Sequence, residues 1–378
     1  MKIGILTLPL HTNYGGLLQA YALQKTLESL GHKVVVLDTD KHPNIRPWYL
    51  RPALWGYYAI QKFIKRKDVE IFQEKRLKRI YEEYLVTSKN TQSFIDTYIH
   101  LRIYKKLSEI KRNEFNAIVV GSDQVWRKKY FFGCCIRNAF LYFTIGWNIK
   151  RVAYAASFGV EKWEYNKKET AECKKAIMNF DAISVREDVG VELCSEYLGV
   201  EALHVLDPTM LLCKEDYEKI VREGNSLQSD GTMLTYVIDE SEQKSNIVTS
   251  IAKAKGLKPF RVNSQFENIS ANLNDRIQPS VQQWLRGFLD ADFVITDSFH
   301  ACVFSIIFNK PFVVIGNKSR GLSRFNSLLS MFGLEDHLIM DIKDLDVEKN
   351  YEIPSSVYGI LNHQKELSLQ FLKNNLPT

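Results

Sequence analysis

Residues 1–40 read MKIGILTLPLHTNYGGLLQAYALQKTLESLGHKVVVLDTD, and this stretch decides the fold. The apolar run 3–10 predicts a buried strand, the amphipathic stretch 17–30 predicts a helix, and the apolar run 34–37 predicts a second strand. A helix that connects two parallel strands of one sheet forms a right-handed crossover in nearly all proteins. The sequence therefore predicts that the chain opens with a Rossmann-like unit.

A short polar segment with Asn13, Gly15 and Gly16 separates the first strand from the helix. We expect a glycine loop here, whose backbone N–H groups could approach an anionic substrate at the N-terminus of the helix. The segment lacks the G-x-G-x-x-G spacing of a dinucleotide site. Two adjacent glycines are equally typical of a tight turn without a ligand, so both interpretations stay open.

The composition is that of a soluble globular protein, with 378 residues, 45% hydrophobic and 25% charged. A chain of this length is expected to form two domains. No run of eighteen uncharged apolar residues predicts a spanning helix, and no secretory signal opens the chain. The six cysteines show no C-x-x-C spacing, so we expect reduced thiols in a cytoplasmic protein and no metal site.

Further apolar runs of the first half end in small or charged polar residues. Since ligands of parallel α/β sheets bind at the carboxyl ends of strands, these residues are candidates for substrate contacts or for acid–base chemistry. They are Ser122, Asp123, Gln124, Ser157 and Arg186.

A second set of apolar runs follows in the second half, at residues 232–238, 258–262, 293–296 and 312–315. We therefore expect an α/β fold with two Rossmann-like domains facing one another across a cleft, over residues 1–212 and 213–353. An amphipathic run within 354–378 predicts a final helix that docks back on the body.

Positive charge is concentrated in residues 41–112, a predicted helical insert with 17 Lys and Arg against 7 Asp and Glu. Aromatic residues alternate with these charges. One interpretation is a set of surface helices with solvated basic faces. Another is an amphipathic patch that contacts an anionic membrane surface or a lipid pyrophosphate. Nucleic acid is disfavoured because no recognised binding motif accompanies the charges.

Residues 294–301 read VITDSFHA and carry the most suggestive chemistry of the chain. A buried strand would deliver Asp297, Ser298 and His300 to its carboxyl edge, where a helix begins. A histidine beside an anion suits a general acid. Capping of the helix by Asp297 or Ser298 fits the same residues equally well.

A cationic loop follows the next strand. It contains Lys318, Arg320 and Arg324, which could clamp a phosphate or carboxylate. The alternative is an ordinary solvated loop.

Seven motifs occur together and in a fixed order. They read NYGGLLQAYALQ, VVGSDQVW, YAASFG, ISVRE, VLDPT, VITDSFHA and SRFNSLLSMFGLE. This set resembles the polysaccharide pyruvyl transferase family over nearly the whole chain, from residue 2 to about residue 337. The resemblance implies a GT-B-like pair of domains, with the acceptor on the N-terminal side and the donor on the C-terminal side. It also implies that phosphoenolpyruvate donates a pyruvyl group to two hydroxyls of one sugar.

The resemblance also implies roles for two residues. His300 matches the functional histidine of the family, and Arg186 matches a basic residue implicated in donor binding. Several members carry Arg-Leu-His where this chain has Ser-Phe-His at 298–300, so one guanidinium is missing at Ser298. A cation of the 318–324 loop could replace it.

The implied product is a cyclic ketal on a capsule, wall or exopolysaccharide component. The reaction needs an acid, a base and an anion clamp, and neither a metal nor a redox cofactor. We expect His300 as the acid and Asp123 or Asp297 as the base. The acceptor would be a sugar or a lipid-linked oligosaccharide, met at the inner face of the cell membrane.

Two other functions stay open at this stage. A nucleotide-sugar glycosyltransferase could use the same two-domain cleft, because one fold serves many activities. A non-catalytic partner in glycan assembly could keep the fold and lose the donor site.

Overall fold

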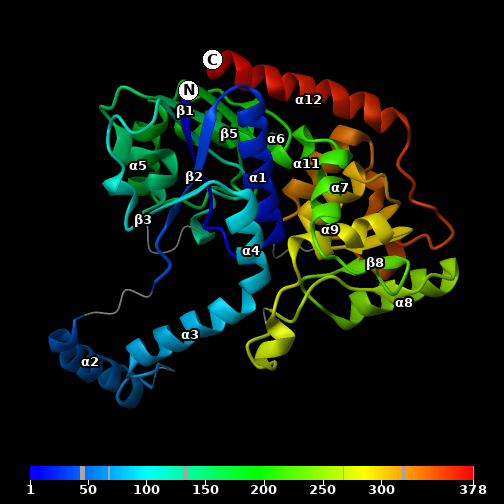
Figure 1. Ribbon diagram of the computed structural model, residues 1–378, viewed down its shortest axis with the longest axis horizontal. Helices are drawn as coiled ribbons and strands as arrows, with labels where there is room; N and C mark the ends of the chain where they lie inside the picture. The colour runs from blue at the N-terminus through cyan, green and yellow to red at the C-terminus, as the bar shows by residue number, and fades with distance from the viewer. Residues whose placement is uncertain (43–46, 67–68, 131–134, 267, 317–320, 378) are drawn as a thin grey trace.

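The computed structural model contains two parallel β-sheets flanked by helices (Figure 1). It describes residues 1–378 except 43–46, 67–68, 131–134, 267, 317–320 and 378. The first sheet is built from the first half of the chain and the second sheet from the second half. The fold is therefore α/β with two Rossmann-like domains, as the sequence predicts.

The first sheet contains, within the described residues, seven parallel strands in the order β3-β2-β1-β4-β5-β6-β7. Its strands are β1 (Lys2–Leu6), β2 (Lys33–Thr39), β3 (Leu101–Tyr104), β4 (Ala117–Val120), β5 (Lys150–Ala156), β6 (Ala182–Val185) and β7 (Leu203–His204). Ile3 of β1 pairs with Val34 on one side and with Ala117 on the other. The predicted opening crossover is confirmed.

The edge strand β3 lies within the basic segment 41–112, for which the sequence predicts only helices. Leu101 pairs with Val36 of β2, so this part of the prediction is wrong. The strand has only four residues, and Ile103 is exposed. A short edge strand with charged neighbours gives little periodic signal, because one side of it faces solvent.

The second sheet contains five parallel strands among the described residues, in the order β12-β11-β10-β8-β9. They are β8 (Met233–Tyr236), β9 (Pro259–Phe260), β10 (Phe293–Thr296), β11 (Phe312–Ile315) and β12 (Leu338–Ile339). All residues of β8, β10 and β11 are buried, which explains their continuous apolar runs.

Helices connect the strands. Their bounds are α1 (Tyr14–Ser29), α2 (Arg51–Phe63), α3 (Gln73–Thr87), α4 (Lys89–Tyr98), α5 (Lys167–Ile177), α6 (Asp188–Leu193), α7 (Lys214–Glu223), α8 (Glu242–Lys255), α9 (Val281–Asp290), α10 (Phe299–Ile307), α11 (Ser323–Phe332) and α12 (Ser356–Asn375). Among their described residues, no helix is long and apolar enough to cross a membrane.

Helix α1 begins three residues earlier than its amphipathic pattern indicates. Gly15 and Gly16 therefore lie in its first turn, and the expected glycine loop is wrong. Asn13 is the N-cap, and its side chain accepts a hydrogen bond from the Gly16 N–H at 3.2 Å. An asparagine cap satisfies a free N–H of the first turn, which stabilises the helix at this position.

Helix α12 runs along the top of Figure 1 and returns from the second domain to the first. Phe371 packs against Tyr154 of β5, and Ser368 accepts a hydrogen bond from the Leu206 N–H at 3.1 Å. Leu372 is fully buried. The predicted docking of a C-terminal helix on the body is confirmed.

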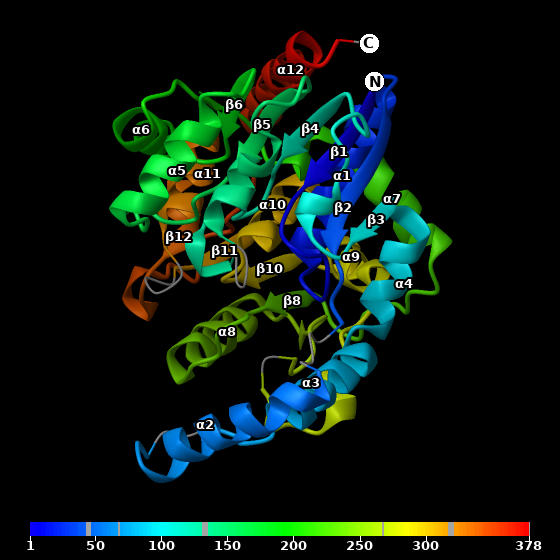
Figure 2. The same cartoon turned by 90° about the vertical axis from the view of Figure 1, so that its left-hand side faces the viewer.

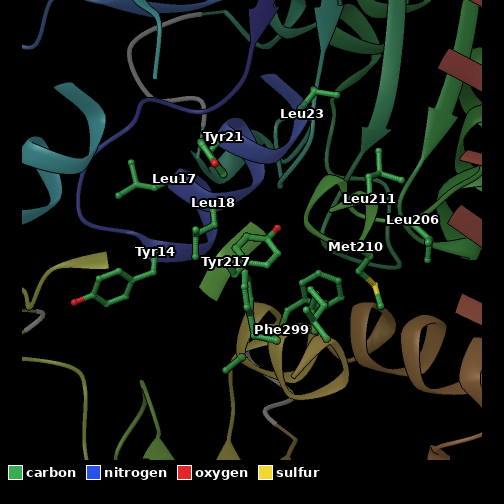
Figure 3. Close-up of a cluster of buried hydrophobic side chains, with 14 of the residues drawn as sticks. Tyr14, Leu17, Leu18, Tyr21, Leu23, Leu206, Met210, Leu211, Tyr217 and Phe299 are labelled. Carbon is green, nitrogen blue, oxygen red and sulfur yellow. The ribbon is translucent and has the colours of Figure 1, made fainter. Parts of the chain in front are cut away.

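A continuous hydrophobic cluster joins the two domains. Figure 3 shows side chains from the start of α1, from residues 206–217 and from Phe299 of α10 packed together. Tyr14 stacks on Trp284 of the second domain with ring centroids 5.4 Å apart, and its hydroxyl donates to the Pro279 carbonyl at 2.8 Å. The carboxyl ends of the strands of both sheets therefore face this packed junction between the two domains.

Candidate functional site

Six charged or titratable side chains lie together at the junction of the two domains. Asp123 follows β4, Arg186 and Glu187 follow β6, and Asp207 follows β7, all at the carboxyl edge of the first sheet. His300 and Arg324 lie in the first turns of α10 and α11 of the second domain. Each of the six is at most 8% exposed.

Arg186 lies at the centre of this cluster. Its Nε donates to Glu187 Oε1 at 2.9 Å, and its Nη1 donates to Asp207 Oδ2 at 3.0 Å. Asp123 Oδ1 lies 3.9 Å from the same Nη1. Burial alone would lower the pKa of Arg186, but the surrounding carboxylates, led by Glu187, raise it above its ordinary value. The guanidinium is therefore permanently charged.

Asp207 connects Arg186 to the second domain. Its Oδ1 accepts hydrogen bonds from the Thr209 N–H at 3.0 Å and hydroxyl at 2.7 Å. Its Oδ2 lies 3.6 Å from Nε2 of His300. Burial would raise the pKa of Asp207, but interactions with His300 and Arg186 hold it well below the usual range. Asp207 is therefore a carboxylate at neutral pH.

Nη2 of Arg186 and Nε2 of His300 are buried nitrogen atoms of this cluster that make no hydrogen bond with any residue that the structure describes. One belongs to each domain, and both side chains neighbour Oδ2 of Asp207. Buried polar atoms without a partner are uncommon, and a substrate that binds here would satisfy them.

Gly15 makes room for the imidazole of His300. A Cβ added at Gly15 would lie closer to His300 Nδ1 than the 3.0 Å below which such atoms essentially never come. At Gly16 the nearest atom to an added Cβ is 3.6 Å away, an ordinary contact. The first glycine is therefore a steric requirement of the site, and the N–H of the second is used by Asn13.

Two guanidinium groups lie near the aromatic ring of Phe299. The Arg186 and Arg324 guanidinium carbons lie 4.4 and 5.8 Å from the centre of its ring. Burial and the neighbouring Arg186 lower the pKa of Arg324 to about 10, so it remains charged at neutral pH. Arg324 thus brings a second buried cation to the junction.

The remaining polar candidates of the first domain surround this cluster. Ser157 donates to Glu187 Oε1 at 2.8 Å, and Ser122 Oγ lies 3.2 Å from Asp207 Oδ2. Gln124 accepts a hydrogen bond from Arg127 at 2.9 Å. These contacts hold Glu187, Asp207 and the loop after β4 in place.

Asp297 has partners other than His300. Its two oxygens accept from the backbone N–H groups of Ile238 and Asp239 at 2.7 and 3.0 Å, and Lys244 Nζ lies 2.6 Å from Oδ2. Asp297 therefore fixes the segment after β8, and this geometry does not favour the predicted role as a base. Ser298 is the N-cap of α10 without a side-chain capping bond.

Lys318 and Arg320 lie outside the described residues. The described part of their loop continues at Gly321, where an added Cβ would lie 2.8 Å from the carbonyl oxygen of Gly159. Its backbone dihedral φ of +84° also favours glycine. The loop after β11 therefore approaches the loop after β5 closely.

Two members of the cluster, Glu187 and Asp207, are missing from the candidates derived from the sequence. Both directly follow apolar runs, in the motifs ISVRE and VLDPT. A rule that collects every acidic residue at a predicted strand end would have found them. Their pairing with Arg186 and His300 depends on the tertiary structure.

Two surface cavities lie in the second domain, away from His300. One of about 280 Å³ lies between β8, β9 and α8 and includes Lys244 and Arg261. The other, of about 490 Å³, lies at the carboxyl ends of β11 and β12 and includes Gly316 and Asp341. Both include Ser241, the N-cap of α8.

The fold and the junction cluster define a two-domain α/β protein with a buried cluster of carboxylates, guanidinium groups and one histidine between its two sheets. The family model described as polysaccharide pyruvyl transferase matches residues 13–319. This match covers most of the chain, and the protein belongs to this family. Among curated proteins, none matches the chain.

Solved structures with a similar arrangement include sugar-nucleotide enzymes. The UDP-GlcNAc 2-epimerase of Neisseria meningitidis is 12% identical, with a TM-score of 0.45, and the match covers 99% of this chain and 100% of that one. Arabidopsis thaliana UGT89C1 is 9% identical, with a TM-score of 0.46 and coverage of 98% and 93%. A UDP-glucosyltransferase of Polygonum tinctorium is 11% identical, with a TM-score of 0.45 and coverage of 99% and 97%.

Proposed function

We propose that this protein transfers the pyruvyl group of phosphoenolpyruvate to two hydroxyls of one sugar, forming a cyclic ketal during the synthesis of a surface polysaccharide. Membership of the pyruvyl transferase family supports polysaccharide pyruvylation. The observation that links this proposal to the junction cluster is that Nε2 of His300 and Nη2 of Arg186 are buried there and make no hydrogen bond with the described residues. An anionic donor that accepts a proton fits such a pair.

The reaction begins with protonation of the methylene carbon of the donor. The neighbouring carbon becomes electrophilic, and a sugar hydroxyl attacks it while its proton passes to a base. The C–O bond to phosphate then breaks and phosphate leaves. The second hydroxyl attacks the same carbon to close the ketal, and its proton passes to the released phosphate. One phosphate is released for each ketal, with no change in oxidation state.

His300 is the proposed acid, and Asp207 is a positioning residue that holds its imidazole. Thr209 donates two hydrogen bonds to the carboxylate of Asp207, so this carboxylate has a fixed position beside the imidazole of His300. Nη2 of Arg186 and the guanidinium of Arg324 would bind the phosphate and carboxylate of the donor. Asp123 is the proposed base, because it follows β4 in the same cluster.

The acceptor is proposed to be a sugar of a capsule, wall or exopolysaccharide unit, carried free or on a lipid. The decisive experiment measures phosphate release from phosphoenolpyruvate with free and lipid-linked sugars. Release that requires both a sugar and the donor, with a ketal detected by mass spectrometry, supports the proposal. Stabilisation by a uridine diphosphate sugar and none by phosphoenolpyruvate would contradict it.

Replacing Arg324 by Gln should weaken phosphoenolpyruvate binding by roughly tenfold or more, because a charge-assisted hydrogen bond contributes about 1.5–3 kcal/mol. Isothermal calorimetry measures the dissociation constant directly. Arg222→Gln is the matched control, since this arginine is exposed on α7. Equal affinities of the two variants would remove Arg324 from the donor site.

Replacing Asp207 by Asn should destabilise the protein at pH 7 by about 3–5 kcal/mol, because it leaves buried cations with one carboxylate fewer. The folded-state pKa of Asp207 lies below its unfolded value of about 3.9. Its stabilising effect is therefore fully present above that value and is lost as the pH falls toward the folded pKa. Denaturant titrations should show a difference between wild type and variant that shrinks from pH 7 to pH 3. A difference independent of pH would contradict this assignment.

A further inference from the structure

Helix α2 forms, with α3, a projecting arm that lies away from both sheets in Figures 1 and 2. Within the arm, Trp55 of α2 packs edge-on against Phe72 with ring centroids 5.3 Å apart, and its Nε1 donates to Glu74 Oε1 at 2.8 Å. At the base of the arm, Glu83 of α3 pairs with Arg276 of the second domain at 2.9 Å. The arm is therefore anchored at one end and presents α2 at the other.

The outward face of α2 is apolar. Four large apolar side chains at helical spacing are exposed on this face. They are Tyr57 (55% exposed), Ile60 (49%), Phe63 (72%) and Ile64 (74%). Ala53 and Gly56 lie on the same face and are also exposed. Residues three and four apart lie on one side of a helix, so these residues form one face. None of them is charged. Of the two interpretations of the basic segment, the amphipathic patch fits this face of α2 better than a solvated basic face.

Helix α7 shows the ordinary pattern in the same protein. Its exposed residues are charged, and its apolar residues, Tyr217, Ile220 and Val221, are buried. An exposed apolar face of several adjacent residues marks an interaction surface, whereas single exposed apolar residues are normal. The exposed apolar face is therefore particular to α2, since the exposed residues of α7 are charged.

The charges around this face indicate its partner. Residues 47–66 contain four cations and no Asp or Glu, and Lys62, Lys65 and Arg66 lie at the end of the helix beside Phe63 and Ile64. Trp48 and Tyr49, just before the helix, are 77% and 64% exposed. Aromatic and apolar residues flanked by cations are typical of helices that lie in the headgroup region of an anionic bilayer.

We propose that the α2 arm is a membrane-docking element that inserts its apolar face into an anionic lipid surface. A second copy of the chain is a poorer occupant, because a helix of 13 residues presents a strip about 20 Å long and roughly 10 Å wide. A stable protein interface needs about 800 Å² from each partner. The inference does not depend on the proposed reaction, because lipid binding requires neither donor nor acceptor.

The test is co-sedimentation of the full chain with vesicles of phosphatidylcholine alone or mixed with phosphatidylglycerol, at low and high salt. The wild type should bind the anionic vesicles at low salt and be released by high salt, since salt screens the cations. The double substitution Ile60→Ser and Phe63→Ser should weaken binding by about 10²-fold, because each inserted side chain contributes roughly tenfold to partitioning.

The matched control is Leu227→Ser with Ile269→Ser, which replaces two apolar side chains, 77% and 83% exposed, outside the arm. This control should bind vesicles like the wild type, and melting temperatures of both variants should show that they fold. Equal binding of the arm variant and the control would overturn the proposal. If the wild type self-associates but does not bind vesicles, and the arm substitutions abolish this self-association, the face binds a second copy of the chain and not a membrane.

Discussion

Replacing His300 by Gln should lower the turnover of pyruvyl transfer by about 10²–10⁴-fold, the usual contribution of a general acid, while the fold is kept. Gln has a polar side chain of similar reach but cannot carry a proton to the donor. Residue 300 lies in the first turn of α10, where Gln, a good helix former, should be accommodated. Phosphate release under saturating donor measures the effect.

His363→Gln is the matched control for this substitution, since His363 is exposed on α12. It should leave both turnover and melting temperature unchanged. Near-wild-type turnover of the His300 variant would remove the histidine from the role of acid. A variant that no longer binds the donor in calorimetry would instead assign His300 to binding.

The second large effect is expected at Gly15. Substitution by Ala should reduce turnover by about 10²-fold, because the added Cβ must displace the imidazole of His300, and a shift of about 1 Å in a reacting group can cost that much. Ala suits a helix better than Gly, so the helix itself should form normally. Steady-state kinetics measure the loss of turnover, and thermal melting shows whether the helix and the fold are kept.

Gly16→Ala provides an unusually close control, one residue further along the same helix. Its added Cβ meets only ordinary contacts, so we expect unchanged turnover and stability that is equal or slightly higher. If both alanine variants have the same activity, the close packing of Gly15 against His300 is irrelevant to catalysis. If both lose the fold, neither glycine position of the first turn of α1 tolerates a side chain.

The sheets were predictable because their strands are buried. Runs such as residues 117–120 and 312–315 contain only apolar residues, and short continuous apolar runs between polar segments are typical of buried strands in a soluble domain. The edge strand β3 was missed because it is short and half exposed. The start of α1 differs from the prediction because Gly15 and Gly16, which indicate a loop, lie in the first turn of the helix that Asn13 caps.

The candidate site was predictable only in part. His300, Arg186, Asp123 and Arg324 follow predicted strands or loops, and the structure gathers them at one junction. The central position of Asp207 could not be derived, because it depends on how two distant segments pack. Asp297 has the same local signal as a site residue, yet its partners are the backbone after β8 and Lys244.

The junction of the domains has a consequence for how the chemistry is assembled. His300 comes from one half of the chain, and the carboxylate that faces it comes from the other. Neither half contains both groups, and they come together only where the shared apolar cluster of Figure 3 joins the two domains. With His300 as the proposed acid, catalytic competence depends directly on interdomain docking, and a substitution that loosens the domain contact is expected to lower turnover without touching the site.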